Sequence, residues 1–316
     1  MDAYLRWYYG YKNFGDEMLF FGVLQRIFTT YPLHTLYIEV WDKARMEKRI
    51  QRNNERILLP KWDIKIVEIK QHKRKILTHI LNFIGMGKYR KMFKFFWGGE
   101  VLSDERPFPH DGRNIPLLFH YAVRTKKFAL LWGIGTARKT MTHRLYSTII
   151  PRAQHIILRD KSSYDTACTF TKNKEAIELY QDFAQETILQ VSEKSDEVSE
   201  KSEKKYILIN MKNSEMKEKN IHKIQQFCKK YADYEKIFFP CDMQDDAKCF
   251  EHIQKIAPEL QMFDRTQYSL SEILSLFYHS TWGIGCRLHF LLPLKLYTKD
   301  FEAIPYAEKI SKLILN

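Results

Sequence analysis

The sequence predicts an α/β protein with two domains, each built on a parallel sheet. Short apolar runs alternate with longer amphipathic stretches along most of the 316 residues, which is the pattern of strands and helices in such sheets. This length exceeds what one ordinary domain of about 100–200 residues needs. A charged stretch near residue 200 interrupts the alternation. We therefore place a boundary between two domains there.

Eight apolar runs have the length and composition of strands. Longer amphipathic stretches lie between them, and no repeat with a period of 20–50 residues indicates a solenoid. The expected strands are residues 3–9, 35–40, 93–97, 127–132 and 155–159 before the charged stretch, and residues 206–210, 236–240 and 280–285 after it.

The charged stretch is predicted to be a solvated linker. In "QETILQVSEKSDEVSEKSEKKY", the residues from Ser192 to Lys205 have almost no apolar periodicity. We expect an N-terminal domain over residues 1–183, a linker over residues 184–205 and a C-terminal domain over residues 206–316.

Charge is distributed unevenly along the chain. Residues 1–183 contain 32 lysine or arginine and 18 aspartate or glutamate residues, whereas residues 184–316 contain 19 and 20, within a net charge of +13. The basic half predicts an anionic partner, which is nucleic acid, an anionic membrane or a phosphorylated substrate. No recognition motif for nucleic acid accompanies the basic residues, so we expect no nucleic acid among the partners.

Composition predicts a cytoplasmic protein without metal sites or disulfides. No run of 18 apolar residues occurs, and no basic-then-apolar signal pattern opens the sequence. The five cysteines form no C-x-x-C pair. This usage fits a reducing compartment, in which buried thiols behave as small hydrophobes.

Glycine-containing loops follow several expected strands, at the ends where parallel sheets bind ligands. In "YYGYKNFGDEML", Gly10 and Gly15 allow sharp turns and Asn13 tolerates unusual φ, while Asp16 and Glu17 stand where a helix begins. This loop either contacts a ligand or places acidic residues at a helix N-terminus, where they complement the helix dipole.

Three further loops leave the same two alternatives open. Gly98 and Gly99 follow one expected strand, and Gly135 follows another. Such glycines either let backbone N–H groups hold a phosphate or a sugar, or form ordinary turns. In "ILRDKSSYDTA", Arg159 and Ser163 stand at a strand-to-helix junction, where an N-cap and a surface ion pair are the alternative to binding.

The segment "STWGIGCRLHFLLPLKLY" combines a glycine turn with two cationic side chains. Arg287 and His289 stand at the start of an apolar helix, whose N-terminus repels cations unless an anion is present. Arginine can bind phosphate or carboxylate through two hydrogen bonds, and histidine can exchange a proton near neutral pH. The segment predicts an anion-binding site, with a structural salt bridge as the alternative.

Six short motifs occur in the order "GYKNFGDE", "WGGEVL", "WGIG", "LRDKSS", "GCRLH" and "IPYAEKI". Over about residues 8–310, they resemble the polysaccharide pyruvyl transferase family. The resemblance implies a glycosyltransferase-B-like pair of Rossmann domains with the active site in the cleft between them. It also implies transfer of the enolpyruvyl unit of phosphoenolpyruvate onto two hydroxyls of one sugar, which forms a ketal and releases phosphate.

The resemblance also implies roles for individual residues. Asp16 and His289 are the expected acid–base groups, in either order, and Arg287 is the expected donor-binding arginine; these three form the expected catalytic set. Phosphoenolpyruvate is the donor substrate, and no cofactor is implied. The expected substrate-binding residues are Asn13, Gly15, Gly98, Gly99, Gly135, Arg159, Ser163, Lys212 and Lys309.

Three positions depart from the family's pattern. Glu100 replaces a glycine of a usual triplet, and Lys212 stands where arginine is common, which keeps the charge but loses the bidentate fork. Residues 290–303 form an unusual segment between two motifs. These departures leave a diverged specificity or a reduced activity open.

A glycosyltransferase that uses a nucleotide-sugar donor is the alternative function. Such an enzyme would share the two-domain architecture and the basic first half, since a fold does not fix a function. For either function the acceptor is a sugar, and for the transfer of pyruvate it belongs to a cell-surface polysaccharide or its lipid-linked precursor.

Residues 70–97 predict contact with an anionic membrane surface. The segment contains eight lysine or arginine residues and no acidic residue, and apolar positions from Leu77 to Ile84 share one helical face. We expect peripheral association with the inner face of the cell membrane, where a lipid-linked acceptor would lie. The alternative is a core helix with solvated basic ends.

Overall fold

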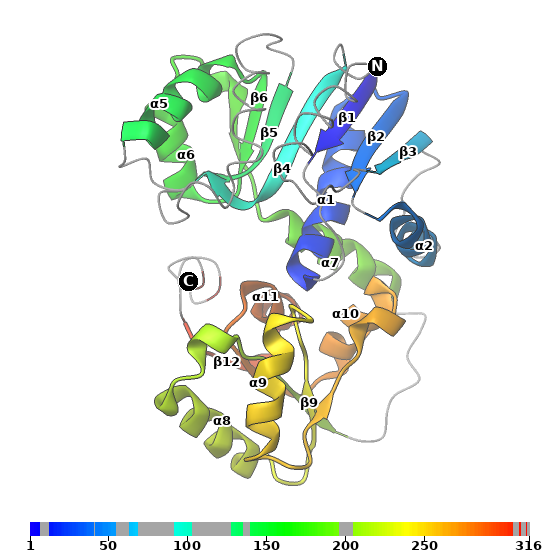
Figure 1. Ribbon diagram of the computed structural model, residues 1–316, viewed down its shortest axis with the longest axis vertical. Helices are drawn as coiled ribbons and strands as arrows, with labels where there is room; N and C mark the ends of the chain where they lie inside the picture. The colour runs from blue at the N-terminus through cyan, green and yellow to red at the C-terminus, as the bar shows by residue number, and fades with distance from the viewer. Residues whose placement is uncertain are drawn as a thin grey trace, which may run out of the picture. The chain divides into compact units, whose positions relative to one another are not determined.

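The computed structural model describes residues 1–6, 13–40, 42–54, 63–68, 92–102, 128–134, 140–195 and 205–305, together with Ile310 and Ile314. The chain divides into two compact units, each with one parallel sheet (Figure 1). The first unit holds Met1–Gly10, Leu19–Lys48 and Leu59–Phe183, and the second holds Tyr11–Met18, Arg49–Leu58 and Ala184–Asn316. Two N-terminal segments therefore belong with the C-terminal part of the chain.

The first unit is built on a seven-stranded sheet in the order β3-β2-β1-β4-β5-β6-β7. Every pairing in it is parallel, and the strand order reverses between β1 and β4. The strands are β1 (Asp2–Arg6), β2 (Thr35–Val40), β3 (Asp63–Glu68), β4 (Phe93–Leu102), β5 (Phe128–Ile134), β6 (His155–Leu158) and β7 (Ile177–Leu179), and the described helices include α1 (Phe14–Thr30), α2 (Lys43–Asn54), α5 (Thr140–Ile149) and α6 (Lys161–Cys168). The start of α1, up to Met18, and the end of α2, from Arg49, belong to the second unit.

The second unit repeats this topology on a smaller scale. Its sheet has the order β10-β9-β8-β11-β12, again with parallel pairings and with a reversal between β8 and β11. The strands are β8 (Tyr206–Ile209), β9 (Glu235–Phe238), β10 (Gln261–Met262), β11 (Trp282–Gly285) and β12 (Asp300–Ala303), and the helices are α7 (Phe183–Ser195), α8 (Glu218–Lys230), α9 (Asp245–Gln254), α10 (Leu270–His279) and α11 (Leu288–Leu296).

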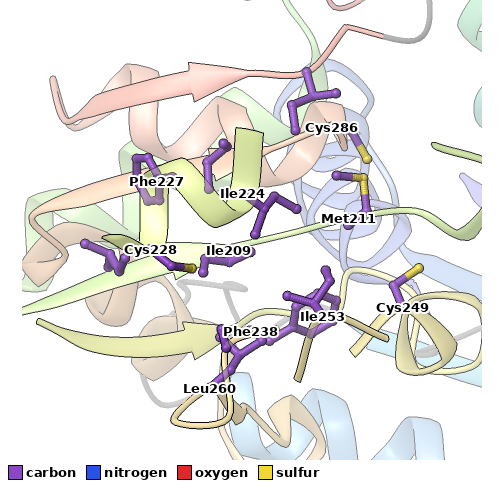
Figure 2. Close-up of a cluster of buried hydrophobic side chains, with 14 of the residues drawn as sticks. Ile209, Met211, Ile224, Phe227, Cys228, Phe238, Cys249, Ile253, Leu260 and Cys286 are labelled. Carbon is purple, nitrogen blue, oxygen red and sulfur yellow. The ribbon is translucent and has the colours of Figure 1, made fainter. Parts of the chain in front are cut away.

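Helices α8 and α9 contribute to the core of the second unit with the central strands (Figure 2). Ile209 of β8 and Phe238 of β9 contribute from the sheet, and Ile224 of α8 and Ile253 of α9 contribute from the helices; all four are fully buried. Burying a side chain of this size stabilises a fold by about 1.5–3 kcal/mol. This core fixes the strand ends that carry the polar residues described below.

The predicted fold class is confirmed, and each of the eight predicted strands corresponds to an observed one. The four strands that the sequence did not indicate, β3, β7, β10 and β12, are the edge strands of the two sheets. Edge strands are covered less completely and are therefore less apolar. In β3, "DIKIVE", every residue is exposed or only partly buried, and β10 consists of two residues that are both exposed.

The first part of the predicted linker is a helix. Helix α7 covers residues 184–195 of the segment predicted to be solvated, and Ala184, Ile188 and Val191 on it are buried. The Thr187 hydroxyl donates a hydrogen bond to the Met18 carbonyl at 2.8 Å. The apolar spacing of three and four residues was present in "FAQETILQV", but the charged sequence that follows obscured it.

The predicted membrane segment falls largely outside the described residues. Residues 70–91 are not among them, and Phe93–Trp97 form the first half of β4. Within the described part of the chain, no helix combines the length and the apolar character that crossing a membrane requires.

Candidate active site

The candidate site lies at the carboxyl ends of β8, β9 and β11, beside the reversal of strand order in the second sheet. Parallel α/β sheets bind ligands at this position, because the loops on either side of the reversal separate there. Asn210 and Lys212 follow β8, and Arg287 follows β11. The backbone N–H of Lys212 contacts the Cys286 Sγ at 3.1 Å, so these two loops touch.

The start of helix α1 packs against this edge of the second sheet. The Phe14 N–H donates to the Cys241 carbonyl at 2.7 Å, and Asn13 forms an isolated antiparallel bridge with Asp242. The buried Phe14 ring lies 5.0 Å from the Phe239 ring and 5.8 Å from that of Phe277. The loop "NFGDE" is therefore part of the same site as the loops after β8, β9 and β11.

Asn13 is the N-cap of helix α1. Its Oδ1 accepts hydrogen bonds from the backbone N–H groups of Gly15 at 2.9 Å and of Asp16 at 3.3 Å, which satisfies two donors that the first turn leaves open. The two acidic residues that follow differ in exposure. Asp16 is exposed, whereas Glu17 is fully buried. Asp16 is therefore the carboxylate that a substrate can reach.

Gly15 lies directly against the imidazole of His289. A β-carbon at residue 15 would be 1.9 Å from His289 Nδ1 and 2.6 Å from its Cγ, closer than real contacts allow. Only glycine lets the ring rest on the helix backbone at this point. The structure thus brings Asn13, Gly15, Asp16 and His289 together in one place.

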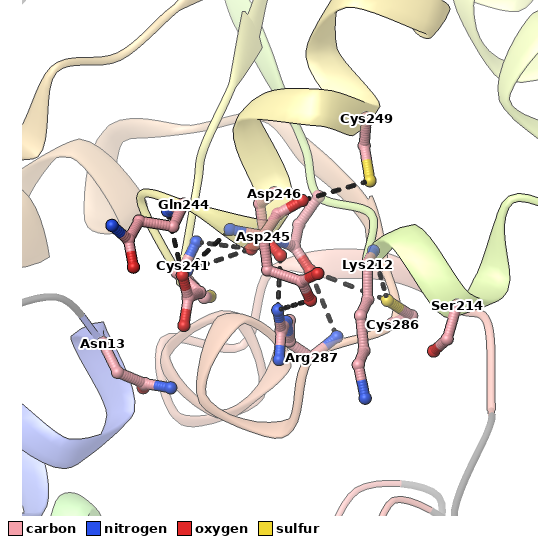
Figure 3. Close-up of polar contacts among 12 residues, drawn as sticks. Asn13, Lys212, Ser214, Cys241, Gln244, Asp245, Asp246, Cys249, Cys286 and Arg287 are labelled. Atoms are coloured by element: carbon pink, nitrogen blue, oxygen red, sulfur yellow. Dashed lines mark hydrogen bonds and ion pairs between the residues drawn. The ribbon is translucent and has the colours of Figure 1, made fainter.

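Arg287 is the N-cap residue of helix α11, and two carboxylates hold its guanidinium (Figure 3). Its Nη2 donates to Asp245 Oδ2 at 2.9 Å and to Asp246 Oδ1. Burial opposes the charge of Arg287, but Asp246 outweighs this effect and raises the pKa of the guanidinium. These contacts are those of the structural salt bridge, the alternative that the sequence left open for this helix start.

A buried network around Asp246 was not predicted from the sequence. Asp246 Oδ2 accepts from the Cys241 N–H at 2.9 Å, the Asp242 N–H at 3.1 Å and Asn210 Nδ2 at 3.3 Å. Asn210 in turn accepts from the Arg287 N–H at 3.1 Å. The network joins the ends of β8, β9 and β11. Its only sequence signal is the acidic run "CDMQDD" after an apolar strand.

Cys286 lies inside this edge without being a nucleophile. Burial raises the pKa of its thiol to about 12, so it stays protonated at neutral pH. Figure 3 shows the Lys212 side chain leaving the sheet beside Cys286. Lys212 is half-buried, and it provides a second cation next to Arg287 at the adjacent strand end.

A second ion-pair group joins the α1 start to two further segments of the second unit. The buried Glu17 pairs with Arg49 of helix α2 and with Arg265, whose Nη1 lies 3.4 Å from Glu17 Oε2. Arg49 Nη1 also donates to the Tyr268 carbonyl at 2.6 Å. Both arginines were missed, since nothing in their sequence neighbourhoods indicates a buried carboxylate partner.

The remaining predicted residues belong to the first unit or lie outside the description. Arg159 Nη1 pairs with Asp182 Oδ2 at 2.9 Å, and Ser163 is bonded to the N-cap residue Asp160 through its N–H at 2.8 Å. These contacts are those of the structural alternative for that loop. Gly135 and Lys309 fall outside the described residues.

The position predicted for Gly98 and Gly99 is wrong. Both lie within β4, which continues to Leu102, and do not follow a strand. The pairing of β4 with β5 shifts register between Gly98 and Glu100 and again between Glu100 and Leu102. Bulges of this kind bend a strand and redirect its side chains.

Solved structures of sugar-modifying enzymes share this fold. S. aureus MnaA with UDP has a TM-score of 0.63 at 11% identity, covering 98% of this chain and 81% of that one. UDP-GlcNAc 2-epimerase from Neisseria meningitidis bound to UDP-GlcNAc has a TM-score of 0.61 at 10% identity, covering 100% and 85%. A glycosyltransferase from Rickettsia africae ESF-5 has a TM-score of 0.53 at 12% identity, covering 98% and 80%. These likenesses show the fold alone, that of glycosyltransferase-B-like proteins with two Rossmann-like units.

Sequence comparison identifies the family. No curated protein is detectably similar to this sequence. The family model described as polysaccharide pyruvyl transferase matches residues 13–292, which include every part of the site around Arg287 and His289. The chain therefore belongs to the polysaccharide pyruvyl transferase family and is a transferase of polysaccharide biosynthesis.

Proposed function

We propose that this transferase moves the enolpyruvyl unit of phosphoenolpyruvate onto two hydroxyls of one sugar, forming a pyruvate ketal and releasing phosphate. The sugar belongs to a cell-surface polysaccharide or to its lipid-linked precursor. One observation carries the proposal: the imidazole of His289 rests on Gly15, in the turn that presents the exposed Asp16. A proton donor and a proton acceptor thus lie beside the cationic ends of β8 and β11.

The donor carries a carboxylate and a phosphate, and both need cationic partners. Arg287 and Lys212 come from the ends of paired strands, so both can face one small anionic ligand. Arginine suits a planar carboxylate through paired N–H groups, whereas lysine acts as a point charge toward phosphate. We assign the donor to this edge of the second sheet, with Lys309 as a further cationic residue.

The reaction needs proton transfers to the methylene carbon and from each attacking hydroxyl, and these residues can perform the first two of them. A proton added to the methylene carbon makes C2 of the donor electrophilic, and a sugar hydroxyl then bonds to C2 and loses its proton. A second hydroxyl bonds to C2 to close the ketal, the C2–O bond to phosphate breaks, and phosphate leaves with the proton of this second hydroxyl. His289 donates to the methylene carbon or to the departing phosphate, and Asp16 accepts a hydroxyl proton. Groups of this kind contribute about 10²–10⁴-fold to a rate.

Phosphate release from phosphoenolpyruvate tests the proposal, with a panel of sugar acceptors that includes lipid-linked ones. His289→Ala should lower the rate by at least about 100-fold and leave the melting temperature nearly unchanged. The control is His252→Ala, since His252 is an exposed residue of α9 outside the site. Full activity of the His289 variant would remove this residue from the mechanism, and no release with any acceptor would contradict the proposed reaction.

A nucleotide-sugar glycosyltransferase is the second candidate. The structural likeness to a glycosyltransferase and to epimerases of UDP-GlcNAc favours it. The two candidates differ in the donor that stabilises the protein, because a ligand that binds only the folded state raises the melting temperature. Phosphoenolpyruvate should produce this shift, and a shift with a uridine or guanosine diphosphate sugar instead would favour the second candidate.

We also propose that the protein meets a lipid-linked acceptor at the inner face of the cell membrane. The support is the basic sequence from Lys70 to Lys91, which carries no acidic residue. The last basic residue of the segment, Lys94, is fully buried in β4 and does not contribute. Basic clusters of this size bind anionic lipid surfaces.

A further inference from the structure

Arg287 is held by two adjacent carboxylates that differ in burial. Asp245 Oδ2 and Asp246 Oδ1 both accept from the same atom, Nη2. The Asp246 side chain is fully buried, whereas that of Asp245 is 39% exposed. The guanidinium therefore has one partner inside the protein and one at its surface.

The two carboxylates also differ in how firmly they are held. Asp246 accepts two further hydrogen bonds from backbone N–H groups and one from Asn210. For the Asp245 carboxylate, Arg287 is the single hydrogen-bond partner among the described residues. Moving Asp246 would break a buried network, while Asp245 can turn into solvent and be hydrated.

The differences in burial and hydrogen bonding determine which of the two carboxylates an incoming anion can displace from Arg287. Two negative charges already lie on the guanidinium, so a third anion beside them would be repelled. Removing Asp246 would leave a buried charge without its partner, which is costly. When the Asp245 carboxylate turns away from Arg287, water hydrates it, and Arg287 Nη2 becomes available to the incoming anion.

We propose that Asp245 is an internal competitor for the donor: its carboxylate occupies the place on Arg287 that an anionic group of phosphoenolpyruvate takes. Asp246 stays bound and orients the guanidinium, so it is a positioning residue. This inference rests on the proposed function for the identity of the anion. It adds that the affinity for phosphoenolpyruvate depends on how readily the donor displaces the Asp245 carboxylate from Arg287.

Replacing Asp245 and Asp246 one at a time with asparagine should change the kinetics with phosphoenolpyruvate in opposite directions. Asp245→Asn should lower the KM for phosphoenolpyruvate about tenfold and change kcat by less than about threefold, since a competing charge is lost. Asp246→Asn should lower kcat/KM by at least about 30-fold, since the arginine loses its buried partner.

Asp242→Asn is the matched control for charge alone. Asp242 lies in the same loop, and its Oδ1 accepts from the N–H groups of Gln244 and Asp245, a role that asparagine keeps. It makes no hydrogen bond to Arg287 within the described structure. Its KM should change less than about twofold. An equal fall in KM for the Asp242 and Asp245 variants would overturn the inference, as would an unchanged KM for Asp245→Asn.

Calorimetry with inorganic phosphate separates this inference from the proposed reaction. If the wild type releases phosphate and Asp245→Asn leaves KM unchanged, the reaction stands and the competition is wrong. If the wild type releases no phosphate, the proposed reaction is wrong, and the binding of inorganic phosphate then tests whether Asp245 competes with anions. Asp245→Asn should then bind about tenfold more tightly than the wild type, and equal binding would overturn it.

Discussion

At the scale of single residues, the site depends on a contact that only one amino acid permits. Gly15 has no β-carbon, and the His289 imidazole fills that space. Asn13 fixes the same turn through two hydrogen bonds to its N–H groups. The position of the ring therefore follows from the backbone of helix α1, and not from side-chain packing alone.

Gly15→Ala should displace the His289 ring, because the added methyl group overlaps Nδ1. We expect kcat/KM to fall about 100-fold, as small displacements of catalytic groups cost this much, with little change in the melting temperature because an imidazole can rotate away. Steady-state kinetics measure the effect. The double variant Gly15→Ala/His289→Ala should be no slower than His289→Ala, and a further additive loss would show that Gly15 acts by another route.

At the scale of elements, a cluster at the first unit's strand ends couples stability to pH. His155 at the start of β6 bonds through Nε2 to Glu178 of β7 at 3.2 Å and through Nδ1 to the Tyr31 hydroxyl at 2.8 Å. Burial lowers the pKa of His155, although Glu178 acts in the opposite direction and Arg26 adds to the lowering. The folded state therefore resists protonation of this ring.

Stability should fall as the pH drops through about 6.5, the ordinary pKa of histidine. Below this pH the unfolded chain binds a proton that folded His155 takes up less readily, so protonation favours unfolding. Urea midpoints at pH 5.5, 6.5 and 7.5 measure the slope, which His155→Gln should reduce. His34→Gln, at a side chain that is 85% exposed, serves as control. An equal slope in the wild type and the His155 variant would be inconsistent with this account.

Secondary structure was predictable where strands are buried on both faces. Runs such as "TLYIEV" and "YILIN" are apolar because helices or loops cover them, and they became β2 and β8. Edge strands such as β12, "DFEA", lack this signal. Among the predicted site residues, Arg287 and His289 follow the end of β11, as the loop motif indicated, and their roles stay predictions. Asp246 and Asn210 were missed, because a buried polar network depends on which strand ends become neighbours.

At the scale of the whole molecule, the sequence did not indicate which segments make up the second unit. Tyr11–Met18 and Arg49–Leu58 belong with Ala184–Asn316. The order of residues along the chain does not show that an N-terminal segment packs with the C-terminal sheet. This packing depends on contacts of Phe14 and Glu17 with residues more than 200 positions later. The basic charge of the chain, by contrast, is fully visible in the sequence.

The wild type should sediment with anionic liposomes at low salt and be released at high salt, since each basic residue near such a surface contributes about 1 kcal/mol. Glutamine at six of the eight basic residues of the predicted segment should abolish sedimentation: Lys73, Arg74, Lys75, Lys88, Arg90 and Lys91. As a control for net charge, glutamine at six exposed lysines of the second unit should leave sedimentation intact: Lys219, Lys223, Lys229, Lys230, Lys248 and Lys255. A wild type that stays in solution at low salt would refute membrane association.

The return of the N-terminal segment to the second unit also sets an order of assembly during translation. Glu17 is separated by 248 residues from Arg265, its partner in the buried ion pair. Ribosomes add about 5–20 residues per second, so about 12–50 s pass between the synthesis of these two side chains. Until the C-terminal part of the chain is made, Phe14 lacks the rings of Phe239 and Phe277. Glu17 has Arg49 as an early partner but lacks Arg265. The part of the candidate site that leaves the ribosome first is therefore completed last, after the C-terminal sheet has formed.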